Sequence, residues 1–142
     1  MTDINQNKNS GIAAFESREF KQAVHFLSPL AEAGDADAQY RMAVIKQNGL
    51  GCAANEEEAA KWMRAAAEQG EPYAQHGLGF MYMEGECLEK DEQKAMEWFL
   101  KAAEQGLPGS MMTIGMMYEQ GQGVEADPAK AQEWYKKAET AG

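Results

Sequence analysis

The side chains that could act as nucleophiles, bases or metal ligands are few in this sequence. Two histidines, His25 and His76, and two cysteines, Cys52 and Cys87, occur among 142 residues. Nucleophilic catalysis needs a hydroxyl or thiol beside a positioned base, and a zinc site needs paired ligands at short spacing. No Cys–His or Ser–His–Asp grouping recurs at such a spacing, so we predict no enzyme, no metal site and no cofactor. The cysteines are expected to be reduced loop residues.

The feature that dominates the sequence is a repeat of 36 residues. Glycines recur at this interval (Gly34, Gly70, Gly106 and Gly142), and so do tryptophans (Trp62, Trp98 and Trp134). Self-similarity at such a period is typical of a solenoid of stacked supersecondary units. The fold class predicted is therefore all-α, built from helix-turn-helix repeats, and such an array offers an extended surface rather than a catalytic pocket.

Each repeat is predicted to contain two helices, A and B. In the unit from Gly70, Pro72 suits the first turn of helix A, Gly85 suits its end, and Asp91 suits the N-cap of helix B over about 92–105. The corresponding helix B of the next unit is expected over about 128–140. Asn55 and Glu58 are expected to form a variant capping box in the first unit.

A column of small residues marks where the two helices of a unit should cross closely. It holds Ala43, Gly79 and Gly115, and we expect the three tryptophans to fill the neighbouring space as buried anchors. The predicted organisation is a single repeat domain, 1–142. It comprises a capping helical hairpin (5–33) with its turn near Ser17 and Arg18, then repeats over 34–69, 70–105 and 106–142.

Charge and hydropathy narrow the function classes. The net charge is −10, which disfavours nucleic-acid binding because that requires Lys and Arg to displace phosphate counterions. No apolar run is long enough for a membrane-spanning helix, and the first ten residues do not resemble a signal peptide, so a cytoplasmic protein is expected. The acidic surface is interpreted as a solvated face or as one that steers a basic partner.

The segment from Ala74 to Gly106 resembles the Sel-one-like repeat, a relative of the tetratricopeptide repeat. The matching residues are Leu78–Gly79, Tyr82, Gly85, Asp91, Lys94–Ala95, Trp98 and Lys101 to Gly106, and the third unit matches at the corresponding positions. The resemblance implies a right-handed superhelix whose concave face, lined by successive A helices, holds another protein. Lys46, Asn55 and Cys87 depart from the pattern, and the paired cysteines of the family's secreted branch are absent.

Columns of helix A that vary between units indicate where a partner would bind. Residues with spacings of three and four form one stripe on this helix, which we expect to face the concave surface. The predicted partner-binding residues are Arg41, Val44, Asn48, Gly77, Phe80, Glu84, Thr113, Met116 and Gln120, with Tyr40, His76 and Met112 at the edge. Methionines suit both an adaptable groove and a core, with Met117 assigned to the core and Met116 to the surface.

The function predicted is a non-enzymatic adaptor that binds a protein or peptide, basic or amphipathic in character. The alternative is a regulator that masks or neutralises a partner enzyme, in the manner of an immunity protein or antitoxin. A hydrolase is favoured least. The last unit ends on Gly142 without a covering helix, which we interpret as a polar-adjusted cap, a truncated end, or an end used for self-association.

Overall fold

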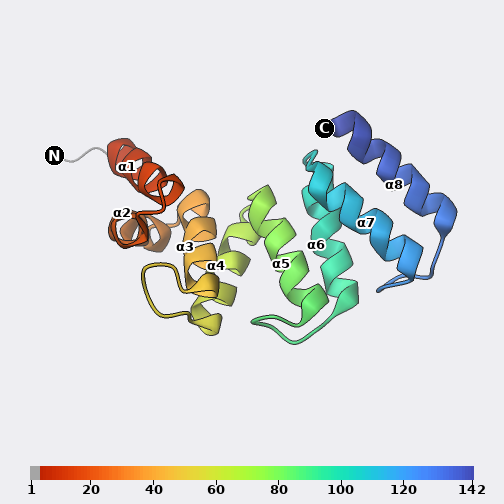
Figure 1. The fold of residues 1–142 in the computed structure, drawn as a ribbon, viewed down its shortest axis with the longest axis horizontal. Helices are drawn as coiled ribbons and strands as arrows, with labels where there is room; N and C mark the ends of the chain where they lie inside the picture. The colour runs from red at the N-terminus through yellow and green to blue at the C-terminus, as the bar shows by residue number, and fades with distance from the viewer. Residues whose placement is uncertain (1–3) are drawn as a thin grey trace. The chain divides into compact units, whose positions relative to one another are not determined.

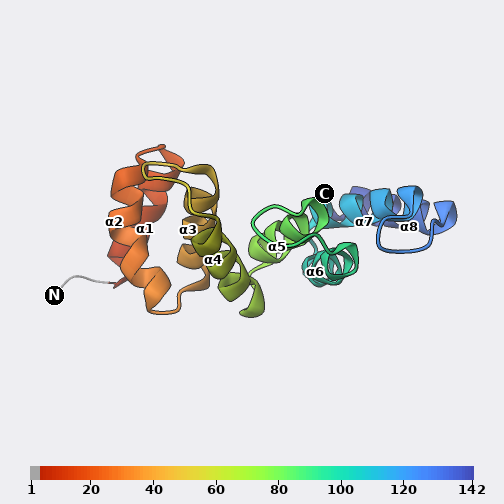
Figure 2. The same ribbon diagram turned by 90° about the horizontal axis from the view of Figure 1, so that it is seen from below.

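The computed structural model describes residues 4–142, which form eight α-helices and no strand. The helices are α1 (Ile4–Glu16), α2 (Phe20–Glu32), α3 (Ala36–Asn48), α4 (Glu56–Glu68), α5 (Pro72–Glu84), α6 (Glu92–Glu104), α7 (Pro108–Gln120) and α8 (Pro128–Ala141). Consecutive helices form antiparallel hairpins such as α1 with α2, α3 with α4 and α7 with α8 (Figures 1 and 2). The all-α prediction is confirmed.

The chain divides into two compact units. The first runs to Ala74 and contains α1 to α4; the second begins at Gln75 and contains most of α5 together with α6, α7 and α8. In the first unit α2 packs on both α1 and α3, and in the second α7 packs on both α6 and α8. Each unit therefore buries its own apolar core.

The predicted helix boundaries and caps agree with the structure where carboxylates begin helices. The Asp91 side chain accepts a hydrogen bond from the backbone N–H of Lys94 at 3.1 Å, and Asp127 accepts one from Lys130 at the same distance. Such N-caps satisfy backbone donors that the first helical turn leaves unpaired. Gly85 has φ +69°, as expected for a residue that ends helix A in the left-handed region.

The capping box expected at the start of α4 is only half formed. Asn55 does cap the helix, accepting a hydrogen bond from the Glu58 backbone N–H at 3.1 Å. The Glu58 carboxylate, however, lies 3.1 Å from Nζ of Lys46, and the Asn55 N–H donates to the Lys46 carbonyl. The reciprocal bond was predicted wrongly because a cation and a carbonyl on the preceding helix compete for both groups.

This ion pair also explains why lysine stands at position 46. The equivalent positions of the second unit's first repeat hold Tyr82 and Lys94, whose Nζ lies 5.5 Å from the tyrosine ring centroid. The last repeat has the same arrangement at 5.6 Å, between Lys130 and Tyr118. Both residues of the pair thus differ between the first repeat and the other two. In the first repeat an ion pair replaces the cation–π contact between the two helices.

The residues that pack against the glycine column are not the tryptophans. A Cβ added to Gly79 would lie 2.7 Å from Cε1 of Phe99, and one added to Gly115 would lie 2.5 Å from Cε1 of Tyr135. Each ring belongs to the residue directly after the tryptophan. The predicted role of Trp98 as the wedge beside Gly79 is therefore wrong, because the next residue of helix B points across the hairpin.

The tryptophans instead lie at the border of the core. Trp62 is buried, but Trp98 and Trp134 are only half-buried. Lysine ammonium groups lie over the rings of all three, at 4.4 Å (Lys61 on Trp62), 4.2 Å (Lys101 on Trp98) and 4.3 Å (Lys137 on Trp134). An indole ring that a lysine covers on one side can remain partly exposed to solvent. The tryptophans of the repeat therefore do not need to be fully buried.

Hydrogen bonds between a buried and an exposed glutamine join the two helices of a repeat at their ends. Gln69 donates to the Gln39 side-chain oxygen at 2.8 Å, and Gln105 donates to Gln75 at 2.9 Å. The last repeat has Met111 and an alanine, Ala141, at these two positions. As with the Lys46 ion pair, the two partners change together, because a single buried amide without its partner would be destabilising.

Cys87 occupies a backbone conformation that favours glycine. Its φ is +66°, and the equivalent Gly51 and Gly123 have φ +69°. A side chain in this region costs about 1–2 kcal/mol, part of which the greater freedom of glycine in the unfolded chain offsets. Cys87→Gly is therefore expected to raise the free energy of unfolding by about 0.5–1 kcal/mol in urea denaturation. Cys87→Ser, which keeps the Cβ atom, is the control, and a glycine variant less stable than the serine variant would contradict the interpretation.

Candidate functional site

The candidate site is the set of twelve residues predicted on the A helices, which are α3, α5 and α7; we call this set the A-helix stripe. Six of them are exposed: Asn48, Phe80, Glu84, Met112, Met116 and Gln120. Five are half-buried: Tyr40, Arg41, Val44, His76 and Gly77. Thr113 is buried, and its hydroxyl donates to the Gly109 carbonyl at 2.9 Å, so it presents no side chain at the surface.

In the first unit, the stripe is occupied by contacts within the protein. The Arg41 Nε donates to the Asp37 carboxylate at 2.9 Å, and its guanidinium lies 5.1 Å from the Phe15 ring centroid. Asn48 donates to the Val44 carbonyl at 2.9 Å. The polar groups of this part are therefore engaged, and a partner would have to compete with them.

Tyr40 lies beside a residue that the sequence analysis did not select, Tyr73. Their ring centroids are 6.1 Å apart, and Tyr73 is 55% exposed. Glu71 lies next to them and caps α5, accepting a hydrogen bond from the Ala74 backbone N–H at 2.6 Å. Burial raises the pKa of Glu71, and burial together with the Glu71 charge raises the pKa of Tyr40. The residue at the Tyr73 position differs between repeats, as the residues of the stripe do. This variation could have identified Tyr73 from the sequence.

In the second unit, three aromatic rings form one cluster. The ring centroids of Phe80 and Phe99 are 5.2 Å apart, those of His76 and Phe80 are 4.9 Å apart, and those of His76 and Phe99 are 5.3 Å apart, all in edge-to-face geometry. Phe99 is completely buried, whereas Phe80 is 38% exposed. The exposed ring is therefore supported from beneath by two others and has little freedom to move.

His76 also joins α5 to α7. Its Nδ1 is 2.7 Å from Oγ of Ser110, within hydrogen-bond distance. Burial lowers the pKa of His76, so the imidazole is neutral at pH 7. A histidine beside a serine could act as a base beside a nucleophile, but Ser110 is completely buried and its hydroxyl cannot reach a substrate. The pair therefore connects two A helices.

The methionines of α7 divide between surface and core. Met112 and Met116 are each 47% exposed, and Met117 is completely buried. The assignment of Met116 to the surface and Met117 to the core is confirmed. The two exposed side chains are one helical turn apart on α7, the helix that His76 of α5 reaches through Ser110.

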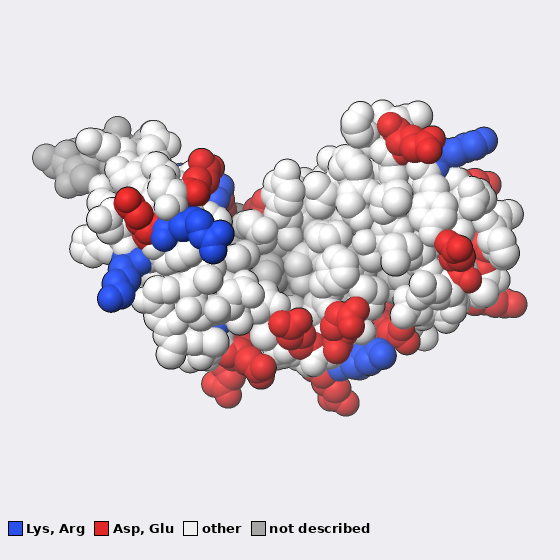
Figure 3. Space-filling view, in the orientation of Figure 1, with Lys and Arg blue, Asp and Glu red and all other residues white. Residues whose placement is uncertain are grey.

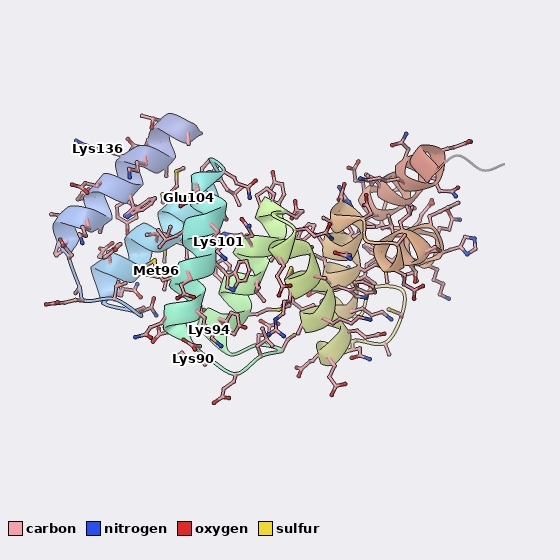
Figure 4. The ribbon with its side chains drawn as sticks, turned by 180° about the vertical axis from the view of Figure 1, so that it is seen from behind. Lys90, Lys94, Met96, Lys101, Glu104 and Lys136 are labelled. Atoms are coloured by element: carbon pink, nitrogen blue, oxygen red, sulfur yellow. The ribbon has the colours of Figure 1, made fainter. Side chains whose placement is uncertain are left out.

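Lysine residues are unevenly distributed over the second unit. Neither α5 nor α7 contains a Lys or Arg residue. Figure 3 shows the side of the molecule on which these helices lie: it is broadly uncharged over them, and acidic groups gather along its lower edge. Figure 4 shows the opposite side, where Lys94 and Lys101 project from α6 and Lys136 from α8. Lys90 projects from the loop before α6. The lysines of this unit thus lie on its B helices and on the loop before α6, and not on its A helices.

The part of the chain that the structure describes contains neither a metal-binding cluster nor a membrane-spanning helix. Within residues 4–142, no group of three or more His, Cys, Asp or Glu side chains is arranged to hold a metal ion. Over the same residues, no helix combines the length and apolar character needed to cross a bilayer. The cysteines of the described chain, Cys52 and Cys87, are half-buried thiols.

Solved structures similar to this one are repeat proteins. A Sel1 repeat protein from Oxalobacter formigenes is 32% identical with a TM-score of 0.86; the match covers 93% of this chain and 54% of that one. A protective antigen of uropathogenic Escherichia coli with an SLR fold is 30% identical with a TM-score of 0.83, over 100% of this chain and 34% of that one. The present chain thus spans about half and about a third of these two proteins.

A more distant structure shares the fold alone. The cysteine-rich protein B of Helicobacter pylori is 20% identical with a TM-score of 0.67, over 86% of this chain and 87% of that one. No curated protein matches the sequence. The family model described as the Sel1 repeat matches three times, at residues 36–71, 72–107 and 108–142. With three such repeats covering most of its length and an α/α solenoid fold shared with these structures, the chain belongs to the Sel1 repeat family.

Proposed function

We propose that the chain is a non-enzymatic adaptor that binds a segment of a partner protein through the A-helix stripe. The Sel1 repeat fold is generally a protein-interaction module, which supports the class of function. The concave face expected from successive A helices is the surface proposed for the partner.

The distribution of exposed apolar side chains is the observation that carries this proposal. Among the described residues, the exposed large hydrophobic side chains are Tyr73, Phe80, Met112 and Met116. All four lie on the A helices α5 and α7. Scattered single apolar residues are common on any surface, but a set confined to one class of helix is typical of an interaction site.

The chemistry of the partner follows from charge. The chain has a net charge of −10, and α5 and α7 carry no cation. A partner segment that carries Lys or Arg beside apolar side chains would gain affinity in two ways. Its apolar side chains would contact Phe80 and the methionines, and its cations would be attracted by the negative charge of this chain. We therefore propose a basic or amphipathic segment.

Affinity capture tests the proposal. Tagged protein should recover a partner from extracts of the native host, identified by mass spectrometry, and Phe80→Ala should reduce its recovery about tenfold or more because it removes an anchor with a supported ring. Arg41→Glu tests the stripe in the first unit. Lys136→Ala, on the exposed side of α8, is the control and should leave recovery unchanged.

Partner recovery by both stripe variants at the level of the unmodified protein would contradict the proposal. Far-UV circular dichroism and thermal melting of each variant separate a loss of binding from a loss of fold. Phe80 is partly exposed, so its truncation is expected to change stability far less than truncation of a core residue.

A further inference from the structure

We infer that the surface formed by His76 and Phe80 on α5 and by Met112 and Met116 on α7 binds the apolar side of a basic amphipathic helix. We call these four residues the α5–α7 platform. The inference rests on the proposed function and goes beyond it by specifying the conformation of the partner and its anchoring residues. All four residues lie in the second unit, so the inference does not depend on the placement of the first.

The platform combines a fixed part with an adaptable part. Phe80 is held by the rings of His76 and Phe99 at centroid distances of 4.9 and 5.2 Å, and Phe99 is completely buried. Met112 and Met116 are unbranched and 47% exposed, so they can adjust to the shape of the partner. A rigid aromatic anchor loses little conformational entropy on binding, and thioethers then fill the remaining space.

The polar groups of the platform favour a helix over an extended segment. An extended peptide brings one N–H and one C=O per residue, and those that face an apolar surface lose their hydration. The platform and its surroundings provide few hydrogen-bonding groups that could replace this hydration. The Nδ1 of His76 is already within hydrogen-bond distance of Ser110, and the Thr113 hydroxyl donates to the Gly109 carbonyl. A helix satisfies its own backbone, so it can lie on such a surface without this penalty.

The spacing of the platform residues agrees with this choice. His76 and Phe80 are four residues apart on α5, and Met112 and Met116 are four residues apart on α7. Each pair therefore covers about one turn, or about 5.4 Å, along its helix. Apolar side chains of a bound helix recur at three and four residues, so two successive ones can contact the two residues of such a pair.

Charge indicates that the polar side of this helix is basic. Residues 75–142 contain twelve Asp and Glu against six Lys, a net charge of −6. Four of those lysines lie over aromatic rings and belong to the B helices: Lys94, Lys101, Lys130 and Lys137. Glu84, at the end of α5, is exposed on the stripe. Lys or Arg side chains that flank the apolar side of the partner helix would thus be attracted by carboxylates. No Lys or Arg on α5 or α7 would repel them.

Two synthetic peptides of identical composition test the inference. Both contain about 18 residues of Leu, Lys and Gln; in one the leucines recur at three and four residues, and in the other they alternate with polar residues. Binding to the full chain is measured by fluorescence anisotropy near physiological ionic strength. We expect the helical-period peptide to bind at least about tenfold more tightly and to gain helicity in circular dichroism.

The protein variants identify the surface that is used. Phe80→Ala combined with Met116→Ala should weaken binding of the helical-period peptide about tenfold or more. Met116→Lys, which keeps side-chain length and adds a cation, should weaken it without creating a cavity. Lys136→Ala is the matched control and should leave the affinity unchanged. Melting temperatures of the variants verify that each is folded.

The possible contrary results are distinguishable. Equal affinity of the two peptides, with the same dependence on Phe80, would overturn the helical conformation and leave the proposed binding surface supported. The same holds if a host partner is captured in a Phe80-dependent way while the helical-period peptide does not bind. Binding that persists unchanged in the Phe80→Ala, Met116→Ala protein would overturn the assignment to the platform, because charge alone would then explain it.

Discussion

Replacing Phe99 by alanine should lower the free energy of unfolding by about 3–5 kcal/mol, the largest effect expected for a single substitution in this chain. Phe99 is completely buried and contacts the rings of both His76 and Phe80. Truncation removes its apolar burial and leaves a cavity beneath the A-helix surface. Urea denaturation followed by far-UV circular dichroism measures the change.

Trp98→Ala is the matched control because Trp98 precedes Phe99 on the same helix. It is half-buried, with the Lys101 ammonium 4.2 Å from its ring centroid. Its truncation should be less destabilising than that of Phe99, although tryptophan is the larger residue and the one that recurs in every repeat. If Trp98→Ala proves the more destabilising, the tryptophan is the principal anchor, as the sequence alone suggested, and the assignment of that role to Phe99 is wrong.

The same substitution should also affect binding. Phe80 depends on Phe99 and His76 for its fixed position, so Phe99→Ala releases the exposed ring as well as weakening the core. Affinity for the helical-period peptide should therefore fall in this variant at temperatures where it remains folded. This result connects the packing of the repeat with the surface that it displays.

The second large effect is expected for Gly79→Ala, which should lower the free energy of unfolding by up to about 2 kcal/mol. Alanine in a helix is more favourable than glycine by about 1 kcal/mol, but overpacking a core costs about 1–3 kcal/mol. The added Cβ would lie 2.7 Å from the Phe99 ring, which is completely buried and has no space to move. Steric overlap is therefore expected to outweigh helix propensity. Thermal and urea denaturation both measure the change.

Two further variants test the steric explanation. Gly115→Ala places a Cβ 2.5 Å from Tyr135, but that ring is half-buried whereas Phe99 is completely buried, so we expect this variant to be less destabilised than Gly79→Ala. The first repeat pairs alanine at this column, Ala43, with Met63 in place of the aromatic residue. Gly79→Ala combined with Phe99→Met should therefore be more stable than Gly79→Ala alone. Equal losses in the two glycine variants and no rescue would exclude steric overlap as the cause.

The repeat period, the helical hairpins and the helix starts could all be predicted from the sequence. These features depend on local chemistry: a carboxylate at residue 91 or 127 caps whichever helix follows it, and a glycine at residue 85 permits positive φ whatever lies around it. The division between Met116 and Met117 also followed from helical spacing. Such signals act over a few residues, so a single sequence contains them in full.

The partners of these residues across the hairpin could not be predicted. Identical placement of tryptophan in every repeat indicated a structural role, but the ring that meets the glycine column is that of the following residue, Phe99 or Tyr135. Glu58 was assigned to a capping box, yet Lys46 attracts its carboxylate from another helix. Both choices depend on side-chain direction in three dimensions, where a rotation of one residue changes which group reaches across.

The sequence by itself determined the architecture of this protein and the face of each A helix that varies between repeats, because periodicity is written in residue order. Only the tertiary structure decided which members of that face could act together. It placed the Arg41 guanidinium over Phe15, buried Thr113, and left Phe80 exposed on a support of two rings. The physical reason is that exposure and support depend on neighbours far away in the chain, whereas a repeat pattern depends only on spacing along it.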